Sequence, residues 1–489
     1  MSNTTRAIVA VCLMVGFYVL ALGIAGVLLW IPYADWKYSE GVDARIAFFC
    51  VLSAGVILWS IVPRADHFEA PGPLINPIEQ PALFGEISKI AQSMGQEMPH
   101  EVYLVPEVNA WVAQRGGTMG FGSRRVMALG MPLMGLLSVS QFRAVVAHEF
   151  GHYHGGDTKL GPWIYKTRAA IGRTLRELDR RNLWVVLAFK WYGNMFLKIT
   201  LGISRAQEYA ADRLAAQVAG ARALVEGLKQ LHRGGVAWQS YLNSEVVPIL
   251  LSGYSPPLSA GLSRFLQAPQ IKLSVEESLD KELSGGKADP MDSHPALRER
   301  ISVLQNVPAS VQEDPRPATD LLADFEQSDT SLFVKELTKV NLKPVQWEQI
   351  LAQVYVPSWQ KEVNCQEEAL RGMTVADVPE QFSNGALVKR IKNPPGIVAD
   401  LPQRVDIARS AVGCALCLAL LRENWTFHTL PGEMYCEKDG QRLEPFVMVQ
   451  KVDRRQLTAE QWKDICGRAG ILNLPLAIKA AATNAAGQT

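Results

Sequence analysis

The chain lacks an excess of charge of either sign. Its 489 residues include 49 Lys and Arg against 48 Asp and Glu, a formal net charge of +1. Such a balance offers neither a broad basic surface for nucleic acid nor a charged tail. Internal repeats and long low-complexity tracts are also missing, which excludes a repeat architecture and a mainly disordered chain.

Cysteine is missing from the middle of the chain. Cys12 and Cys50 lie near the N-terminus, and the next of the seven cysteines is Cys365. The long segment between them therefore has no disulfide framework, as is typical of a reducing compartment.

Cys414 and Cys417 form a C-x-x-C in the apolar run 411–421, with Cys436 and Cys466 further on. Four thiolates could form a structural zinc site. The run favours a buried helix instead, in which cysteine packs as a small hydrophobic residue.

Charge is also missing from two N-terminal stretches, residues 7–30 and 46–62. About 20 apolar residues cross a bilayer, and the second stretch is at the short end of that range. A cleaved signal peptide is the alternative for the first stretch, but its apolar run exceeds roughly 15 residues and lacks an A-x-A site. We therefore expect residues 1–66 to form a transmembrane hairpin. The flanking basic residues weakly favour both ends inside, with the rest of the chain in the cytoplasm.

A third apolar stretch, Leu183 to Ile203, is interrupted by Lys190 and Lys198. Lysine near the middle of a span is costly in lipid. We expect a buried or surface-lying helix, with a segment in the membrane or at its interface as the alternative.

The strongest local pattern is H-E-F-G-H at residues 148–152, after an apolar run. On a helix, His148 and His152 lie one turn apart on one face, so both imidazoles can bind one metal ion. Glu149 can then act as a base on the water that the metal activates.

A catalytic zinc site needs a third protein ligand and an open position. The best candidate lies in residues 204–212, where Glu208 and Asp212 share a helical face. Glu208 can coordinate the metal, and Asp212 can accept an N–H from a ligating histidine. The alternative is that Glu208 and Asp212 belong to an ordinary solvent-exposed acidic face of a helix.

Between the anchor and this motif, the pattern predicts a helix over 82–94 and strands over 101–105, 110–113 and 125–129. Residues 308–319 are typical of an interdomain linker. Asp439-Gly440 predicts a hairpin in the C-terminal region.

Together these motifs resemble the HtpX and CAAX-prenyl-protease type of membrane zinc metallopeptidase, which are gluzincins. The resemblance covers roughly residues 70–305 and rests on four ordered elements: Asn109-Ala110-Trp111, the H-E-F-G-H, the segment from Ser204 to Asp212, and His294-Pro295 followed by Arg300. Asp157 also fits an aspartate shortly after the second histidine.

The resemblance implies a zincin-like α+β domain in which substrate lies extended along a sheet edge, near Asn109 and Ala110. Three roles stay open for His294: stabilising the oxyanion, occupying the open zinc position, or capping a helix ahead of Pro295. Proline suits the first helical turn, so residues 293–295 should start a helix in each case. Arg300 pairs either with an active-site carboxylate or with one at the surface.

We therefore expect a membrane-anchored zinc endopeptidase, with one Zn²⁺ per chain and polypeptide substrates, in membrane protein quality control. Its segments are the anchor (1–66), the metallopeptidase domain (67–307) and an α+β region (320–489). The resemblance favours a bacterial cytoplasmic membrane, with the lipid bilayer as the other partner and no nucleic acid. Prenyl-protein processing is the less favoured variant, and a binding or chaperone-like module with a silent protease is the alternative. Nothing in the sequence fixes an oligomeric state.

Overall fold

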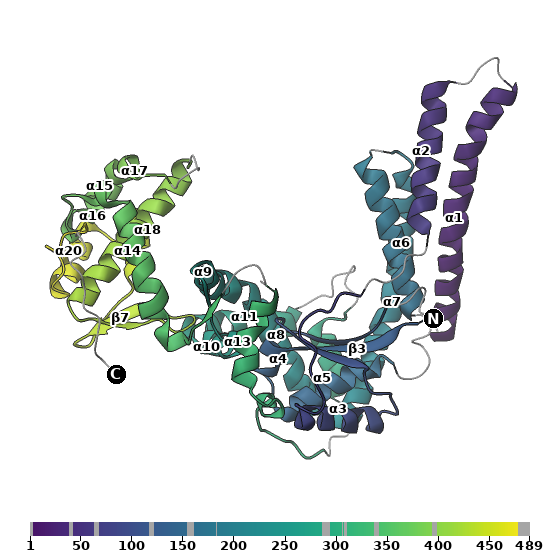
Figure 1. The fold of residues 1–489 in the computed structure, drawn as a ribbon, viewed down its shortest axis with the longest axis horizontal. Helices are drawn as coiled ribbons and strands as arrows, with labels where there is room; N and C mark the ends of the chain where they lie inside the picture. Colours follow the sequence, from purple (N-terminus) through teal and green to yellow (C-terminus); the bar gives the residue numbers. More distant parts are fainter. Residues whose placement is uncertain are drawn as a thin grey trace. The chain divides into compact units, whose positions relative to one another are not determined.

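The computed structural model describes residues 3–38, 43–62, 68–116, 122–153, 161–181, 183–285, 294–305, 307, 311–336, 342–393 and 399–477. The chain divides into two compact units. The first unit comprises Met1–Val236 and Leu273–Glu336, and the second comprises Ala237–Lys272 and Leu337–Thr489 (Figure 1).

Two long apolar helices form the N-terminal hairpin, α1 (Asn3–Tyr38) and α2 (Ala44–Ile61). By length and composition both can cross a membrane. Asp43 begins α2 because its carboxylate accepts the backbone N–H groups of Arg45 and Ile46. Large apolar side chains are exposed on both helices, as at Val19 and Phe48. The two apolar helices predicted over 7–30 and 46–62 are confirmed.

A second helix pair packs against this hairpin within the first unit. α6 (Gly161–Arg180) and α7 (Val186–Ala219) share a buried apolar cluster with α1 and α2 (Figure 1). Tyr192 of α7 donates its hydroxyl to the carbonyl of Leu13 in α1 at 2.5 Å. The third apolar stretch is thus a half-buried helix. By length and composition, α1 and α2 are the only described helices that could span a membrane.

A three-stranded sheet lies beside these helices. It contains β1 (Glu101–Val105), β2 (Ala110–Arg115) and β3 (Arg124–Gly130), in the order β1-β3-β2. β3 pairs parallel to β1 and antiparallel to β2, so β2 is an edge strand. The three strands predicted from alternation are present.

The rest of the first unit is helical. α5 (Val139–Gly151) is amphipathic only weakly, because it is buried on most sides. The other elements are α3 (Pro81–Ser93), α4 (Met131–Met134), α8 (Ala221–Tyr241), α11 (Pro269–Gly285), α12 (Leu297–Leu304), η3 (Ala318–Leu321) and α13 (Phe325–Glu336), of which α8 and α11 continue into the second unit.

The described part of the predicted linker, residues 311–319, is not a free connection. Its backbone pairs with the start of α5: Val139 donates to the carbonyl of Arg316 at 2.8 Å, and Asp314 donates to Ser140 Oγ at 2.6 Å. Arg143 of α5 reaches the Asp314 carboxylate at 3.5 Å. This segment therefore packs with the first unit.

The second unit is built around α18 (Leu401–Arg422), whose residues 411–420 are buried. Its remaining elements are η2 (Leu242–Val246), α9 (Val247–Leu251), β4 (Tyr254–Ser255), α10 (Leu258–Gln267), β5 (Lys343–Pro344), η4 (Trp347–Gln349), η5 (Leu351–Tyr355), α14 (Val356–Cys365), α15 (Glu367–Leu370), η6 (Val375–Asp377), α16 (Val378–Ser383), α17 (Ala386–Arg390), β6 (Thr426–His428), β7 (Tyr435–Lys438), β8 (Gln441–Leu443), α19 (Pro445–Asp453) and α20 (Ala459–Arg468).

Residues 237–272 belong to this second unit by packing, although they lie inside the sequence-predicted segment 67–307. The reason is an aromatic cluster: Tyr241 contacts both Phe265 and Trp347, with ring centroids 5.5 and 6.3 Å apart. The hairpin predicted at Asp439-Gly440 joins β7 to β8. The mixed helix and strand content confirms the α+β class.

The four cysteines of the possible thiolate site, Cys414, Cys417, Cys436 and Cys466, are buried and unbridged in this core. Burial raises the pKa of Cys414, Cys436 and Cys466 to about 12, so these thiols stay protonated. Among the described residues, no cysteine belongs to a group close enough to hold a metal ion. The cysteines therefore act as apolar packing, and the four-thiolate alternative finds no support.

Candidate metal centre

α5 places the two histidines of the motif side by side. The helix begins with a capping box, in which Ser138 and Gln141 each accept the other's backbone N–H. His148 lies in its last turn and His152 is the C-cap residue. Their ring centroids are 4.8 Å apart and the rings are nearly perpendicular. The spacing of the motif thus brings both imidazoles to one face, as predicted.

α7 brings a carboxylate to the same point because it crosses α5 very closely. A Cβ on Gly151 would lie 2.8 Å from the Cα of Ala211, so glycine is needed at this crossing. Glu208 Oε2 lies 3.4 Å from His148 Nε2, and its Oε1 lies 3.6 Å from His152 Nε2. The three candidate ligand atoms are all within 4.8 Å of one another, and no second group of this kind exists in the described ranges.

His148 is held by its other ring nitrogen. Nδ1 lies 2.9 Å from Oδ1 of Asp212, one helical turn after Glu208. Arg300 of α12 in turn donates two hydrogen bonds to Asp212, at 2.6 and 2.8 Å. Both Asp212 and Arg300 are buried. The chain Arg300–Asp212–His148 therefore fixes the imidazole with Nε2 toward Glu208, and Arg300 pairs with a site carboxylate rather than a surface one.

Burial and hydrogen bonding shift the pKa values of the two histidines in opposite directions. Burial alone would lower the pKa of His148, but hydrogen bonds to Asp212 and Glu208 outweigh it and raise the pKa to about 9. Burial, reinforced by the nearby charge on His148, lowers the pKa of His152 to about 4. Without a metal, His148 is therefore protonated at neutral pH and His152 is neutral.

The two glutamates also differ. Burial raises the pKa of Glu149 to about 7, against the opposing effect of the positive charge on His148. Burial would do the same to Glu208, but hydrogen bonds to His148 and His294 hold the pKa of that carboxyl well below its usual range. Glu208 is thus a permanent anion, while Glu149 is poised to exchange a proton near neutral pH.

The donor set fits zinc. Two imidazole nitrogens and one carboxylate oxygen are a known catalytic zinc set, which leaves one position open. Oε2 of Glu208 is buried and faces His148 Nε2 at 3.4 Å and Arg300 Nη2 at 3.7 Å, so this carboxylate oxygen is held among positively charged groups at the point where the two histidines meet.

The span that holds these groups, residues 77–307, matches peptidase family M48. The chain carries an M48 metallopeptidase domain.

Relatives of the M48 domain have one name in common. The chain is 25 % identical over 261 residues to the "Protease HtpX homolog" of Acaryochloris marina, covering 49 % of this chain and 84 % of that protein. It is 26 % identical over 228 residues to "Protease HtpX" of Idiomarina loihiensis, covering 40 % of this chain and 75 % of that protein. It is 24 % identical over 300 residues to the "Protease HtpX homolog" of Methylacidiphilum infernorum, which covers 56 % of this chain and 90 % of that protein. No solved structure matches the chain. The resemblance drawn from the motifs is confirmed.

The edge strand of the M48 domain is covered by side chains of the site. Val112 of β2 donates its N–H to Glu149 and accepts the hydroxyl of Tyr153 at 2.9 Å. Asn109 Oδ1 accepts the N–H of Ala110 at 2.9 Å, which begins β2. Asn109 and Ala110 thus lie at the start of the edge strand, just before Val112.

Tyr153 is the site residue that the sequence did not reveal. Its hydroxyl also receives a backbone hydrogen bond from Gln114, and its ring lies under Arg125, 4.4 Å from the guanidinium carbon. Its position directly after His152 is the only available signal, because its partners depend on the register of β2. Tyr153 therefore occupies main-chain groups on the outer edge of β2.

His294 is exposed but lies at the centre, with Nδ1 3.2 Å from Oε1 of Glu208. α12 begins at Leu297, with Ala296 as N-cap. The expectation that His294 and Pro295 start a helix is therefore wrong, since Pro295 precedes the N-cap residue and lies outside the first helical turn. Asp157 lies outside the described residues.

Proposed function

We propose that this chain is a membrane-anchored, zinc-dependent endopeptidase with Glu149 as general base. The observation that carries the proposal is the convergence of His148, His152 and Glu208 from two crossing helices, with Glu149 beside them. A zinc ion held by these three residues would supply a Lewis acid that activates water and polarises the scissile carbonyl.

The protein's own groups have separate tasks in this proposal. Glu149, with its raised pKa, takes the proton of the attacking water and passes it to the leaving amine. Asp212 and Arg300 position the His148 ring. His294, exposed beside Glu208, is placed to donate a hydrogen bond to the oxyanion.

Substrate would bind as an extended strand along β2. An edge strand offers main-chain hydrogen bonds that do not depend on sequence, which suits loose preference. Asn109 and Ala110 would contact the substrate near the scissile bond. Tyr153 must leave the carbonyl of Val112 for the strand to extend further.

The cellular setting follows from the anchor. Two helices able to cross a membrane precede the catalytic residues, and the named relatives are bacterial or archaeal proteases. We propose residues 1–66 as the anchor, 67–307 as the catalytic segment and 320–489 as an accessory region. The catalytic side faces the cytoplasm, and the substrates are misfolded or membrane-associated polypeptides in protein quality control.

The deciding experiment compares the purified wild type with Glu149→Gln in detergent. We expect the wild type to contain one zinc per chain and to cleave casein, and chelation to stop cleavage. Glu149→Gln should keep the zinc but lose activity by about 10²- to 10⁴-fold, because it removes only proton transfer. Full zinc content without cleavage by the wild type would favour the binding or chaperone-like module instead.

A further inference from the structure

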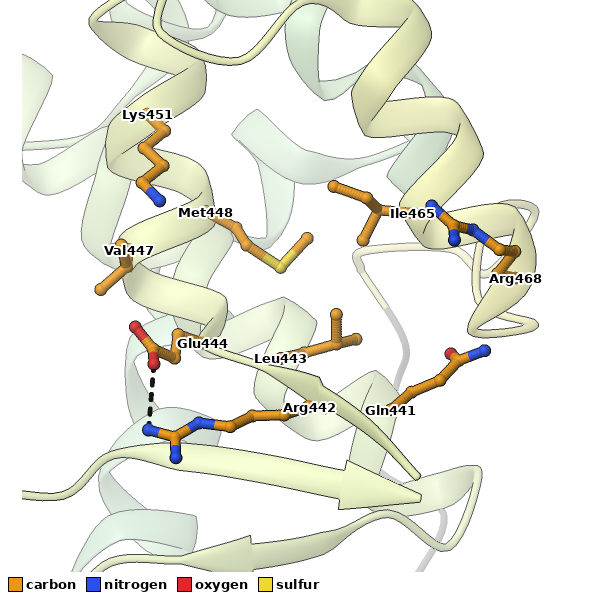
Figure 2. A pocket seen from close by; sticks show the side chains of 9 residues that line it. All are labelled: Gln441, Arg442, Leu443, Glu444, Val447, Met448, Lys451, Ile465 and Arg468. Carbon is orange, nitrogen blue, oxygen red and sulfur yellow. Dashed lines mark hydrogen bonds and ion pairs between the residues drawn. The ribbon is translucent and has the colours of Figure 1, made fainter. Parts of the chain in front are cut away.

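The second unit contains a cavity of about 470 Å³ between β8, α19 and α20. This is within the range of ligand sites, roughly 300–1,000 Å³. Residues 441–444 line one side in sequence, and side chains of both helices line the others (Figure 2).

The floor of this cavity is apolar. Leu443 and Met448 are each 8 % exposed, and Ile465 is partly buried. Figure 2 shows Met448 and Ile465 extending toward each other from the two helices, above Leu443. A large apolar side chain of a ligand would be removed from water here.

The rim of the cavity is mainly basic. Arg442, Lys451 and Arg468 line it against a single carboxylate, Glu444. That carboxylate is paired with Arg442 at 3.1 Å, and the Arg442 guanidinium carbon lies 3.7 Å from the centre of a tyrosine ring. Arg468 is paired with Asp464 of the same helix, whereas Lys451 forms no ion pair with any described residue. Lys451 therefore gives the rim an uncompensated positive charge that attracts an anionic ligand.

The strand beside the cavity has a free edge. The sheet order is β6-β7-β8, so among the described strands β8 pairs with β7 alone. Asp439 and Gly440 both have positive φ and form a two-residue hairpin loop, which makes Lys438 and Gln441 the hydrogen-bonded pair. The next pair along the strands, Glu437 and Arg442, is therefore not hydrogen-bonded, and the N–H and C=O of Arg442 point away from β7. They are available to another extended chain.

We propose that this cavity binds an extended acidic segment of a polypeptide. The segment would lie along β8, put an apolar side chain on the floor, and place a carboxylate against Lys451. The free main-chain groups of Arg442 favour a polypeptide over a lipid, which has no backbone to pair with them. If the proposed peptidase function holds, the cavity is a recruitment site for substrates that carry such a segment.

The binding test does not depend on catalysis. Full-length Glu149→Gln protein in detergent is titrated with a fluorescent, end-blocked nine-residue peptide that alternates Leu and Glu. A matched peptide has Gln in place of Glu. We expect the acidic peptide to bind at least tenfold more tightly, with the difference shrinking at high salt.

Two variants locate the site. Lys451→Glu should weaken acidic-peptide binding about tenfold, since it reverses one rim charge. Lys463→Glu makes the same change on an exposed part of α20 outside the cavity and should change nothing. Circular dichroism confirms that both variants are folded.

Three results would overturn the proposal: equal binding of the two peptides, equal effects of the two variants, or Lys451-dependent binding of phosphatidylglycerol in place of the peptide. In the active enzyme, Lys451→Glu should raise KM for a substrate bearing the segment and leave kcat alone. If the protein cleaves nothing, the peptidase proposal fails while the titration still decides the binding site.

Discussion

Two regions of this chain carry residue patterns typical of metal ligands, and they differ in what surrounds those residues. At the α5–α7 crossing, His148, His152 and Glu208 come from two helices and point at one another. In α18, Cys414 and Cys417 lie on one buried helix among apolar side chains. Both patterns are short and regular in sequence. Convergence of charged and hydrogen-bonded partners from separate helices, rather than spacing alone, makes one of them a site.

The sharpest test of this contrast removes one candidate ligand from each region. Glu208→Ala should abolish stoichiometric zinc binding and lower kcat/KM by at least about 10²-fold, because two imidazoles alone hold zinc poorly. Cys417→Ala should leave the zinc content at one per chain and cost only stability. The measurement is metal content by mass spectrometry with casein cleavage. Zinc loss from the cysteine variant would reverse the comparison.

The next test weakens the support of one ligand. Arg300→Ala leaves the buried Asp212 carboxylate without its guanidinium and frees the His148 ring. We expect zinc affinity or activity to fall by about 10- to 100-fold. Arg298→Ala, on the exposed side of the same helix, is the matched control. Equal behaviour of the two variants would show that Arg300 has no part in positioning the ring.

A pH titration tests the metal centre without mutation. The metal-free pKa of His148 is raised to about 9, so zinc must displace a proton from it at neutral pH. Zinc affinity should rise about tenfold per pH unit up to about pH 9, and then level off. Calorimetry in buffers of different ionisation enthalpy counts the released protons. A pH-independent affinity would mean that His148 is already neutral in the metal-free protein.

The smallest effect concerns the covered edge strand. Tyr153→Phe removes the hydroxyl bound to Val112 and keeps the ring beside Arg125. We expect KM for peptide substrates to fall roughly threefold, the worth of one neutral hydrogen bond. The steady-state kinetics should show kcat nearly unchanged. A drop in kcat would instead mean that the hydroxyl takes part in the reaction.

Prediction from the sequence succeeded where the information is local and failed where it depends on register. The two histidines and Glu149 lie within about one turn of helix. Glu208 was predicted because it shares a helical face with Asp212, and the family resemblance supported that choice. Tyr153 was missed because its partners on β2 are about 40 residues away. The start of α12 was misplaced because Pro295 was interpreted as a first-turn residue, whereas the helix begins at Leu297 with Ala296 as its N-cap.

Packing between distant segments was likewise beyond the sequence patterns. Residues 237–272 join the second unit through an aromatic cluster whose members are spread from Tyr241 to Trp347. Residues 311–319 have the composition of a linker, yet hydrogen bonds hold them to α5. Composition predicts the conformation of a segment in isolation, whereas these tertiary contacts determine where the segment packs in the folded protein.

The helix α7 runs without a break from its contact with α1 to the metal centre. Tyr192 contacts α1 at Leu13, and Glu208 follows sixteen positions later in the same helix. At 1.5 Å per residue, a stiff rod of about 24 Å separates the two levels. One continuous helix therefore sets the distance between the contact with α1 and the carboxylate of the metal centre.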